Sequence, residues 1–151
     1  MRAAADRFFV DTNVLLYSLD PAETVKRPIA ASWLAALWGS DSGETSWQVL
    51  NEFYSNAVRK AGLPVSIARD QVTTIAHWNP VGFGLGIVER AWHWTDNTGI
   101  PYWDALIVAA AETAGCKYLL SEDFQPGQKF GGVTVVNPFR ASPEEFGLSR
   151  R

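Results

Sequence analysis

Four acidic side chains have the type and the placement that metal-assisted hydrolysis requires: Asp11, Glu52, Asp104 and Asp123. Hard divalent cations such as Mg²⁺ or Mn²⁺ take oxygen ligands, and four carboxylates roughly balance the charge of two such ions. A metal ion held there lowers the pKa of a bound water and neutralises a phosphate group, so that a phosphodiester can be hydrolysed without a protein nucleophile. We therefore expect metal-dependent hydrolysis where these side chains converge.

No competing nucleophile scheme is evident in the chain. The single Cys116 has no histidine near it in sequence, and His77 and His93 are isolated from each other. There is no nucleophile elbow, P-loop or cysteine-rich zinc pattern. The glycines of residues 82–86 lack the spacing of a nucleotide-binding loop. A phosphatase that forms an aspartyl-phosphate at Asp11 is disfavoured because the Asp-x-Asp pattern is absent.

The first and last of the four acids follow short apolar runs that predict strands. Residues 7–10 lead directly into Asp11, and residues 118–121 come just before Asp123. Ligand sites of open α/β sheets lie beyond the carboxyl ends of the strands, so we expect both acids at one sheet edge. A helix N-cap is the alternative for Asp11, and a turn residue is the alternative for Asp123. The neighbouring Glu122 is expected to be exposed.

The other two acids fall on predicted helices. Thr45 and Gln48 have the spacing of a capping box, and the apolar stripe that follows indicates a helix that carries Glu52. Asp104 lies in the first turn of a predicted helix over residues 102–114, which is apolar nearly all round and should be buried against a sheet. A solvated helix face is the alternative for Glu52, and a favourable position in the helix dipole is the alternative for Asp104.

The remaining segments alternate between helix and strand patterns. Three further helices are indicated, over residues 27–38, 66–77 and 85–95. Two further strands are indicated, over residues 78–83 and 133–136. This alternation predicts an α/β fold, a three-layer α/β/α sandwich with a mainly parallel central sheet. We expect one domain over residues 1–140 and a polar, marginally ordered C-terminal tail over residues 141–151.

Composition and charge limit the partners and the location of the protein. The 151 residues contain no apolar run near the roughly 20 residues of a membrane span, and no signal-peptide pattern, so we expect a cytoplasmic protein without a membrane partner. A net charge of −3 argues against broad electrostatic wrapping of nucleic acid but allows a local basic patch. Candidate phosphate contacts, with dispersed solvating charge as the alternative, are Arg59, Lys60, Arg69, Arg90, Lys117, Lys129 and Arg140.

Four segments, taken together and in this order, resemble the PIN-domain family. In particular they resemble the VapC-like toxin ribonucleases of bacterial toxin–antitoxin pairs. The segments are VDTNVL at residues 10–15, QVLNEF at 48–53, YWDALIVAAA at 102–111 and LLSEDF at 119–124. The match covers nearly the whole chain.

The resemblance implies an activity and a set of roles. The residues that match the family's catalytic, metal-binding acids are Asp11, Glu52, Asp104 and Asp123, and those that match the polar residues beside them are Thr12 or Asn13 and Ser121. It implies Mg²⁺ or Mn²⁺ as cofactor, endonucleolytic cleavage of RNA, a homodimer, and a small antitoxin that covers the active site. The alternative function is a non-catalytic PIN-fold module that binds RNA or a protein, which the four intact acids disfavour.

Overall fold

The computed structural model of the protein describes residues 6–148. Its five-stranded sheet has the order β2-β1-β3-β5-β4, and every neighbouring pair is parallel except β4 with β5. The strands are β1 (Phe8–Val10), β2 (Gly43–Glu44), β3 (Tyr118–Leu120), β4 (Lys129–Phe130) and β5 (Val133–Val136). The predicted, mainly parallel central sheet is therefore confirmed.

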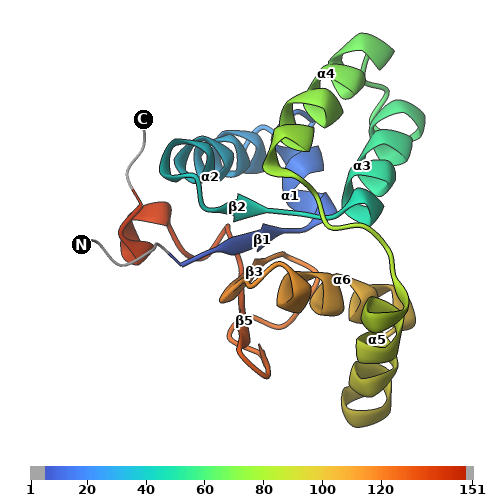
Figure 1. Ribbon diagram of the computed structural model, residues 1–151. Coiled ribbons are helices and arrows are strands. Elements are labelled where there is room, and N and C mark those ends of the chain that lie inside the picture. The colour runs from blue at the N-terminus through green and yellow to red at the C-terminus, as the bar shows by residue number, and fades with distance from the viewer. Residues whose placement is uncertain (1–5, 149–151) are drawn as a thin grey trace.

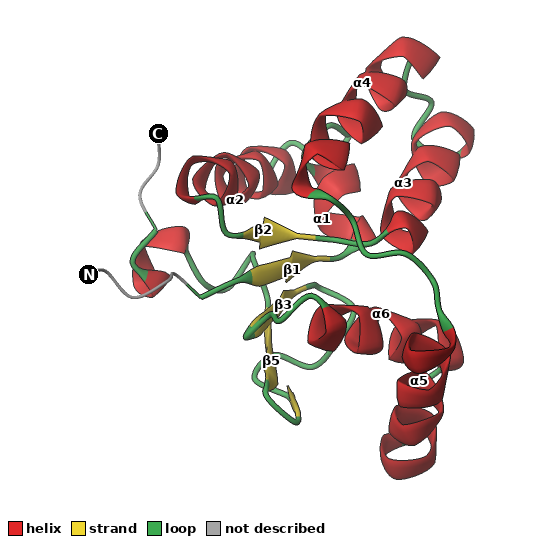
Figure 2. Ribbon diagram, viewed as in Figure 1, coloured by secondary structure: helices red, strands yellow, loops and turns green. Residues whose placement is uncertain are grey.

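Helices cover both faces of the sheet, as Figures 1 and 2 show. On one side lie α1 (Thr12–Tyr17), α2 (Lys26–Ser40), α3 (Trp47–Arg59) and α4 (Val65–Ile75), and on the other lie α5 (Leu85–Thr98) and α6 (Tyr102–Thr113). Two short 3-10 turns, η1 (Ala76–Trp78) and η2 (Pro143–Phe146), complete the described chain. This is the expected three-layer α/β/α arrangement. None of the helices within residues 6–148 has the length and apolar character needed to cross a membrane.

The core is formed by the strands and the inner faces of the helices. All three residues of β1 are buried, as are seven consecutive residues of α6 from Ala105 to Ala111. A strand buried on both faces reads as a continuous apolar run, which is why β1 and β3 were predictable from sequence. The core thus fixes the carboxyl ends of two adjacent parallel strands, where Asp11 and Ser121 follow.

The N-cap of the helix that carries Glu52 lies one residue later than predicted. Ser46 is the N-cap of α3, and its hydroxyl accepts a hydrogen bond from the Val49 backbone N–H at 3.2 Å. The prediction of Thr45 as the cap is wrong because the buried Thr45 hydroxyl instead donates to the carbonyl of Val10 at 3.0 Å. Thr45 therefore ties the start of α3 to the end of β1, beside the first acid.

Two strands of only two residues each, β2 and β4, were not predicted, and the candidate strand over residues 78–83 is a single bridge between Val81 and Ser46. Such short segments carry no period that a sequence pattern can reveal. In β2, Gly43 is held against the ring of Trp78, where an added Cβ would lie 2.5 Å from the ring. Glycine is required at this position because the Trp78 ring leaves no room for a side chain.

The segment after Arg140 packs against the domain. Phe146 in η2 lies 5.4 Å from Phe8 between ring centroids, and the indole N–H of Trp33 donates to the carbonyls of Pro138 and Ala141. The expected marginal order is therefore wrong for residues 141–148. The segment is polar as a whole, but Phe146 and Leu148 provide apolar surface that packs against the core. Residues 149–151 of the predicted tail lie outside the described part.

Candidate active site

A cavity of about 200 Å³ opens beyond the carboxyl ends of β1 and β3. All four acids singled out in the sequence contribute to its wall. The residues that line it come from α1, α3, α6 and the loop after β3: Asp11, Thr12, Asn13, Leu16, Glu52, Asn56, Trp103, Asp104, Ile107 and Asp123. Acids separated by more than 100 positions in the chain thus share one concave site.

Asp11 is the most buried of these acids, with 6% of its surface exposed. Its Oδ1 accepts the Thr12 backbone N–H at 2.7 Å as the N-cap of α1, and its Oδ2 accepts the Ser121 hydroxyl at 2.7 Å. Asn13 adds a long contact of 3.5 Å from its amide nitrogen to Oδ2. Asp11 is therefore both the N-cap of α1 and part of the cavity wall, two roles that the sequence left as alternatives.

Burial raises the pKa of Asp11 to about 7. The hydrogen bonds from Ser121 and Thr12 act in the opposite direction, whereas the charges of Asp123 and Glu52 raise it further. Burial also raises the pKa of Asp104, and the charges of Asp123 and Glu52 again contribute. In the absence of a cation, burial and the neighbouring acids therefore disfavour the charged forms of Asp11 and Asp104.

Glu52 faces the cavity from α3 and is held at both oxygens. The Thr12 hydroxyl donates to Oε2 at 2.9 Å, and the Gln48 amide donates to Oε1 at 2.8 Å. Thr12 therefore contacts Asp11 through its backbone and Glu52 through its side chain. Gln48, only 8% exposed, is a supporting residue that the sequence analysis missed, although its spacing of four residues from Glu52 would have indicated one helix face.

Asp104 and Asp123 enter the cavity from different sides. Asp104 lies in the first turn of α6, and Asp123, which is itself exposed, lies in the loop after β3. The backbone N–H of Asp123 donates to the Ser121 hydroxyl oxygen at 3.1 Å. Trp103 also lines the cavity and is 63% exposed, so an exposed aromatic residue lies at its edge.

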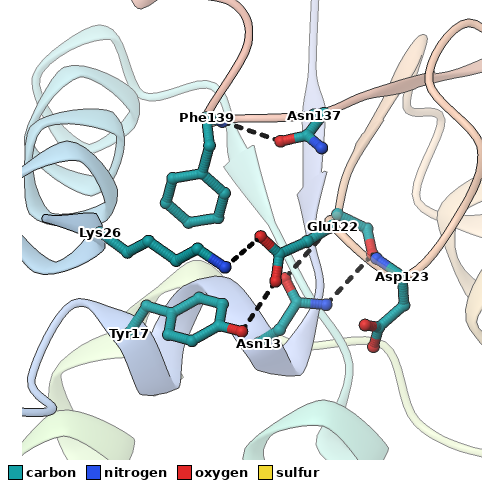
Figure 3. A network of polar contacts seen from close by, with 8 residues as sticks. Asn13, Tyr17, Lys26, Glu122, Asp123, Asn137 and Phe139 are labelled. Atoms are coloured by element: carbon teal, nitrogen blue, oxygen red, sulfur yellow. Dashed lines mark hydrogen bonds and ion pairs between the residues drawn. The ribbon is translucent and has the colours of Figure 1, made fainter. Parts of the chain in front are cut away.

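Glu122 is not exposed as expected but is held in a network of polar contacts, which Figure 3 shows. The Lys26 ammonium donates to its Oε2 at 2.6 Å and the Tyr17 hydroxyl to its Oε1 at 2.7 Å. Burial opposes the charged form of Glu122, but these two hydrogen bonds outweigh it and lower the pKa of the carboxyl group. No local pattern in the sequence indicates this network, because its members lie on three separate elements.

Comparison with known proteins matches the PIN domain family over residues 8–127 of this chain. The chain belongs to the PIN domain family. The match spans the segments that carry all four cavity acids. A search of curated proteins finds no match.

Two solved structures share the fold of this PIN domain. A toxin-antitoxin complex from Klebsiella pneumoniae contains a chain that is 18% identical, with a TM-score of 0.64, over 86% of this chain and 96% of that one. The Mycobacterium tuberculosis protein VapC20, described as a Sarcin-Ricin loop cleaving toxin, is 22% identical, with a TM-score of 0.53, over 77% of this chain and 89% of that one. At these identities the likeness establishes the fold.

The basic residues that were candidates for phosphate binding do not line the cavity of this PIN domain. Arg90 pairs with Glu112 at 2.9 Å, and Lys117 lies 3.5 Å from Asp6. Arg69 donates to the Tyr54 hydroxyl. Within the described chain, the residues around the cavity include four acids and neither lysine nor arginine.

The donor chemistry of the cavity fits a hard divalent cation. Carboxylate oxygens are the ligands that Mg²⁺ and Mn²⁺ prefer, and a cation would favour the charged forms of Asp11 and Asp104, whose pKa values are raised by burial and, to a smaller extent, by the neighbouring acids. In residues 6–148, however, no three His, Cys, Asp or Glu side chains are already gathered closely enough to hold one ion. Binding of an ion by three of these carboxylates would therefore need them to lie closer together than they do here.

Proposed function

We propose that this protein is a Mg²⁺- or Mn²⁺-dependent endoribonuclease and the toxin of a type II toxin–antitoxin module. The observation that carries the proposal is the meeting of Asp11, Glu52, Asp104 and Asp123 in one cavity of a PIN domain. The two structural neighbours, one from a toxin-antitoxin complex and one described as a toxin that cleaves the Sarcin-Ricin loop, support it.

The charge of the cavity supports metal dependence. A phosphodiester that approaches four carboxylates is repelled, and among the described lining residues no lysine or arginine offsets that repulsion. We infer that the four acids hold one or two divalent ions, which when bound supply a water of lowered pKa and neutralise the phosphate. Ser121 and the Thr12 backbone hold both oxygens of Asp11, so the carboxylate keeps one orientation. Thr12 and Gln48 do the same for Glu52.

The substrate side of the cavity favours an unpaired nucleotide. Trp103 lines the cavity together with the acids and is largely exposed, and the rings of Tyr102 and Trp103 pack edge-on with centroids 5.7 Å apart. Unpaired bases stack on such aromatic surfaces, and sequence-specific proteins most often recognise single-stranded RNA loops. We infer that Trp103 stacks on a base next to the phosphate that is cleaved.

The proposed partners are a small antitoxin, which would cover the cavity, and a second copy of the chain. Exposed apolar side chains provide surface for such contacts, and they include Val65, Ile67, Phe83, Leu85 and Trp92. We expect a homodimer in the cytoplasm. Light scattering of the purified protein measures the oligomeric state directly.

The toxin proposal is tested by inducing the wild type and Asp11→Asn in a bacterial host at equal expression levels. We expect growth arrest with the wild type and normal growth with Asp11→Asn, because the variant loses the most buried carboxylate of the cavity. Asp70→Asn, at an exposed acid of α4, is the control and should arrest growth like the wild type. Equal arrest by the wild type and Asp11→Asn would favour the non-catalytic binding module.

A further inference from the structure

Glu122 joins the two helices after β1 to the loop that carries Asp123. Its carboxylate accepts hydrogen bonds from Tyr17, the last residue of α1, and from Lys26, the first residue of α2. The Lys26 ammonium also lies 4.8 Å from the ring centroid of Tyr17 and 5.2 Å from that of Phe139. In Figure 3 the Glu122 side chain points toward these partners while the Asp123 side chain points away from them.

The same loop is tied to the first acid through Asn13. The Asn13 side-chain oxygen accepts the Glu122 backbone N–H at 3.3 Å, and its amide nitrogen donates to the Ser121 hydroxyl oxygen at 3.2 Å. Ser121 in turn donates to Asp11. The network therefore runs without a break from Lys26 on the outside of the site to the Asp11 carboxylate.

Asp123 depends on this loop for its position. Its backbone N–H is bonded to Ser121, but within residues 6–148 its carboxylate accepts no hydrogen bond. A carboxylate without side-chain partners takes its place from the backbone that carries it. The adjacent Glu122 is the residue of this loop whose side chain is anchored to α1 and α2.

We propose that Glu122 is a positioning residue: held by Lys26 and Tyr17, it fixes the loop so that the Asp123 carboxylate is presented to the divalent cation. This inference rests on the proposed metal-dependent function. Residues that orient the ligands of a metal typically change its affinity by about 10- to 100-fold when they are mutated. The charge and both hydrogen-bonding oxygens of Glu122 are needed, because Lys26 and Tyr17 use one oxygen each.

The chain contains a matched control for a merely structural ion pair. Glu112, at the far end of α6 from Asp104, accepts from the Arg90 guanidinium at 2.9 Å and from the Trp94 indole N–H at 2.6 Å. This arrangement has the same parts as the Glu122 network, namely a half-buried acid, a cation and an aromatic donor. It lines no part of the acidic cavity.

The test compares Glu122→Gln with Glu112→Gln by calorimetric titration with Mn²⁺ and by the kinetics of RNA cleavage. We expect Glu122→Gln to weaken Mn²⁺ binding about 10-fold and to lower kcat with little change in KM for RNA. Glu112→Gln should leave both unchanged. Tyr17→Phe, which keeps the ring beside Lys26 but loses the hydroxyl donor, should show a smaller loss and guards against misfolding of Glu122→Gln.

A double-mutant cycle with Asp123→Asn shows whether Glu122 acts through its neighbour. In the Asp123→Asn background, Glu122→Gln should add little further loss of Mn²⁺ affinity, because the ligand it positions is already gone. Additive losses, or equal behaviour of Glu122→Gln and Glu112→Gln in a wild type that does cleave RNA, overturn the inference while the proposed function stands. A wild type that neither binds Mn²⁺ nor cleaves RNA overturns both.

Discussion

The Ser121 hydroxyl donates to Oδ2 of Asp11 at 2.7 Å and joins two side chains 110 positions apart in the chain. Ser121 follows β3 and Asp11 follows β1, and these two strands are parallel neighbours in the sheet. The same hydroxyl oxygen accepts the Asp123 backbone N–H, so one buried serine contacts both strand-end acids. Several expected outcomes depend on this contact.

Ser121→Ala should lower RNA cleavage at pH 7 by about 10-fold or more, since a hydrogen bond to a charged group contributes about 1.5–3 kcal/mol. The Ser121 hydrogen bond lowers the pKa of Asp11, so its loss should raise that pKa and shift ionisation of Asp11 to higher pH. Carbon-detected NMR titration of the carboxyl groups, without divalent cation, measures this shift. Ser18→Ala removes a buried hydroxyl outside the cavity and is the control. An unchanged Asp11 titration in Ser121→Ala would contradict the assigned contact.

Asp11→Asn should be more stable than the wild type at neutral pH in the absence of divalent cations. The folded pKa of about 7 lies above the ordinary value of 3.8, so the wild type loses stability as the pH rises from about 4 to about 7. The amide that replaces the carboxylate has no charge to desolvate, and the difference should reach about 2–4 kcal/mol at pH 8 and vanish near pH 3. Urea unfolding at several pH values measures it. A difference that is constant with pH would show that Asp11 titrates normally.

Divalent cations should stabilise the wild type, because they bind the folded cavity and relieve repulsion between its acids. At a metal concentration about 100-fold above Kd, the melting temperature should rise by about 5–10 °C. The rise in melting temperature should be much smaller in Asp104→Asn. It should be as large as in the wild type in Asp70→Asn, which replaces an exposed acid on α4. Thermal unfolding with Mg²⁺, Mn²⁺ or a chelator measures this. Equal rises in wild type and Asp104→Asn would place the metal elsewhere.

Trp103→Ala should weaken the binding of a short single-stranded oligoribonucleotide by about 10-fold, because stacking on an aromatic side chain contributes about 1–3 kcal/mol per base. Fluorescence anisotropy in an Asp11→Asn background separates binding from cleavage. Trp92→Ala is the matched control, because Trp92 is 52% exposed on α5 and lies outside the cavity lining. Similar affinities of the two variants would show that Trp103 does not contact the RNA.

Those parts of the fold that bury a continuous apolar face were predictable from sequence. The runs before Asp11 and Asp123 and the apolar helix α6 predicted two parallel strands and a buried helix, and the structure confirms all three. The positions of Asp11 and Asp123 follow from this geometry, because neighbouring parallel strands end at one edge of the sheet. Glu52 was different, since its helical pattern equally suited a solvated face, and only the family resemblance favoured the site.

Contacts between distant elements were not predictable in the same way. The Thr12 hydroxyl reaches Glu52 because α1 packs beside α3; the two residues lie 40 positions apart, and no local period encodes that packing. The Lys26–Glu122 pair joins residues 96 positions apart, and each residue alone has the character of a surface charge. Likewise, Ser46 rather than Thr45 caps α3 because Thr45 has a better partner in Val10, which lies 35 positions away.

The central claim is that the four cavity acids support metal-dependent cleavage of RNA, and mapping of RNA ends tests it most directly. Purified wild type and Asp11→Asn are incubated with total RNA, with Mg²⁺ or Mn²⁺ or with a chelator, and the new ends are sequenced. We predict internal cuts at a small set of positions with wild type plus metal, and none with the chelator or with Asp11→Asn. The same cuts made at the same rate by Asp11→Asn, or by the wild type in chelator, would contradict the claim.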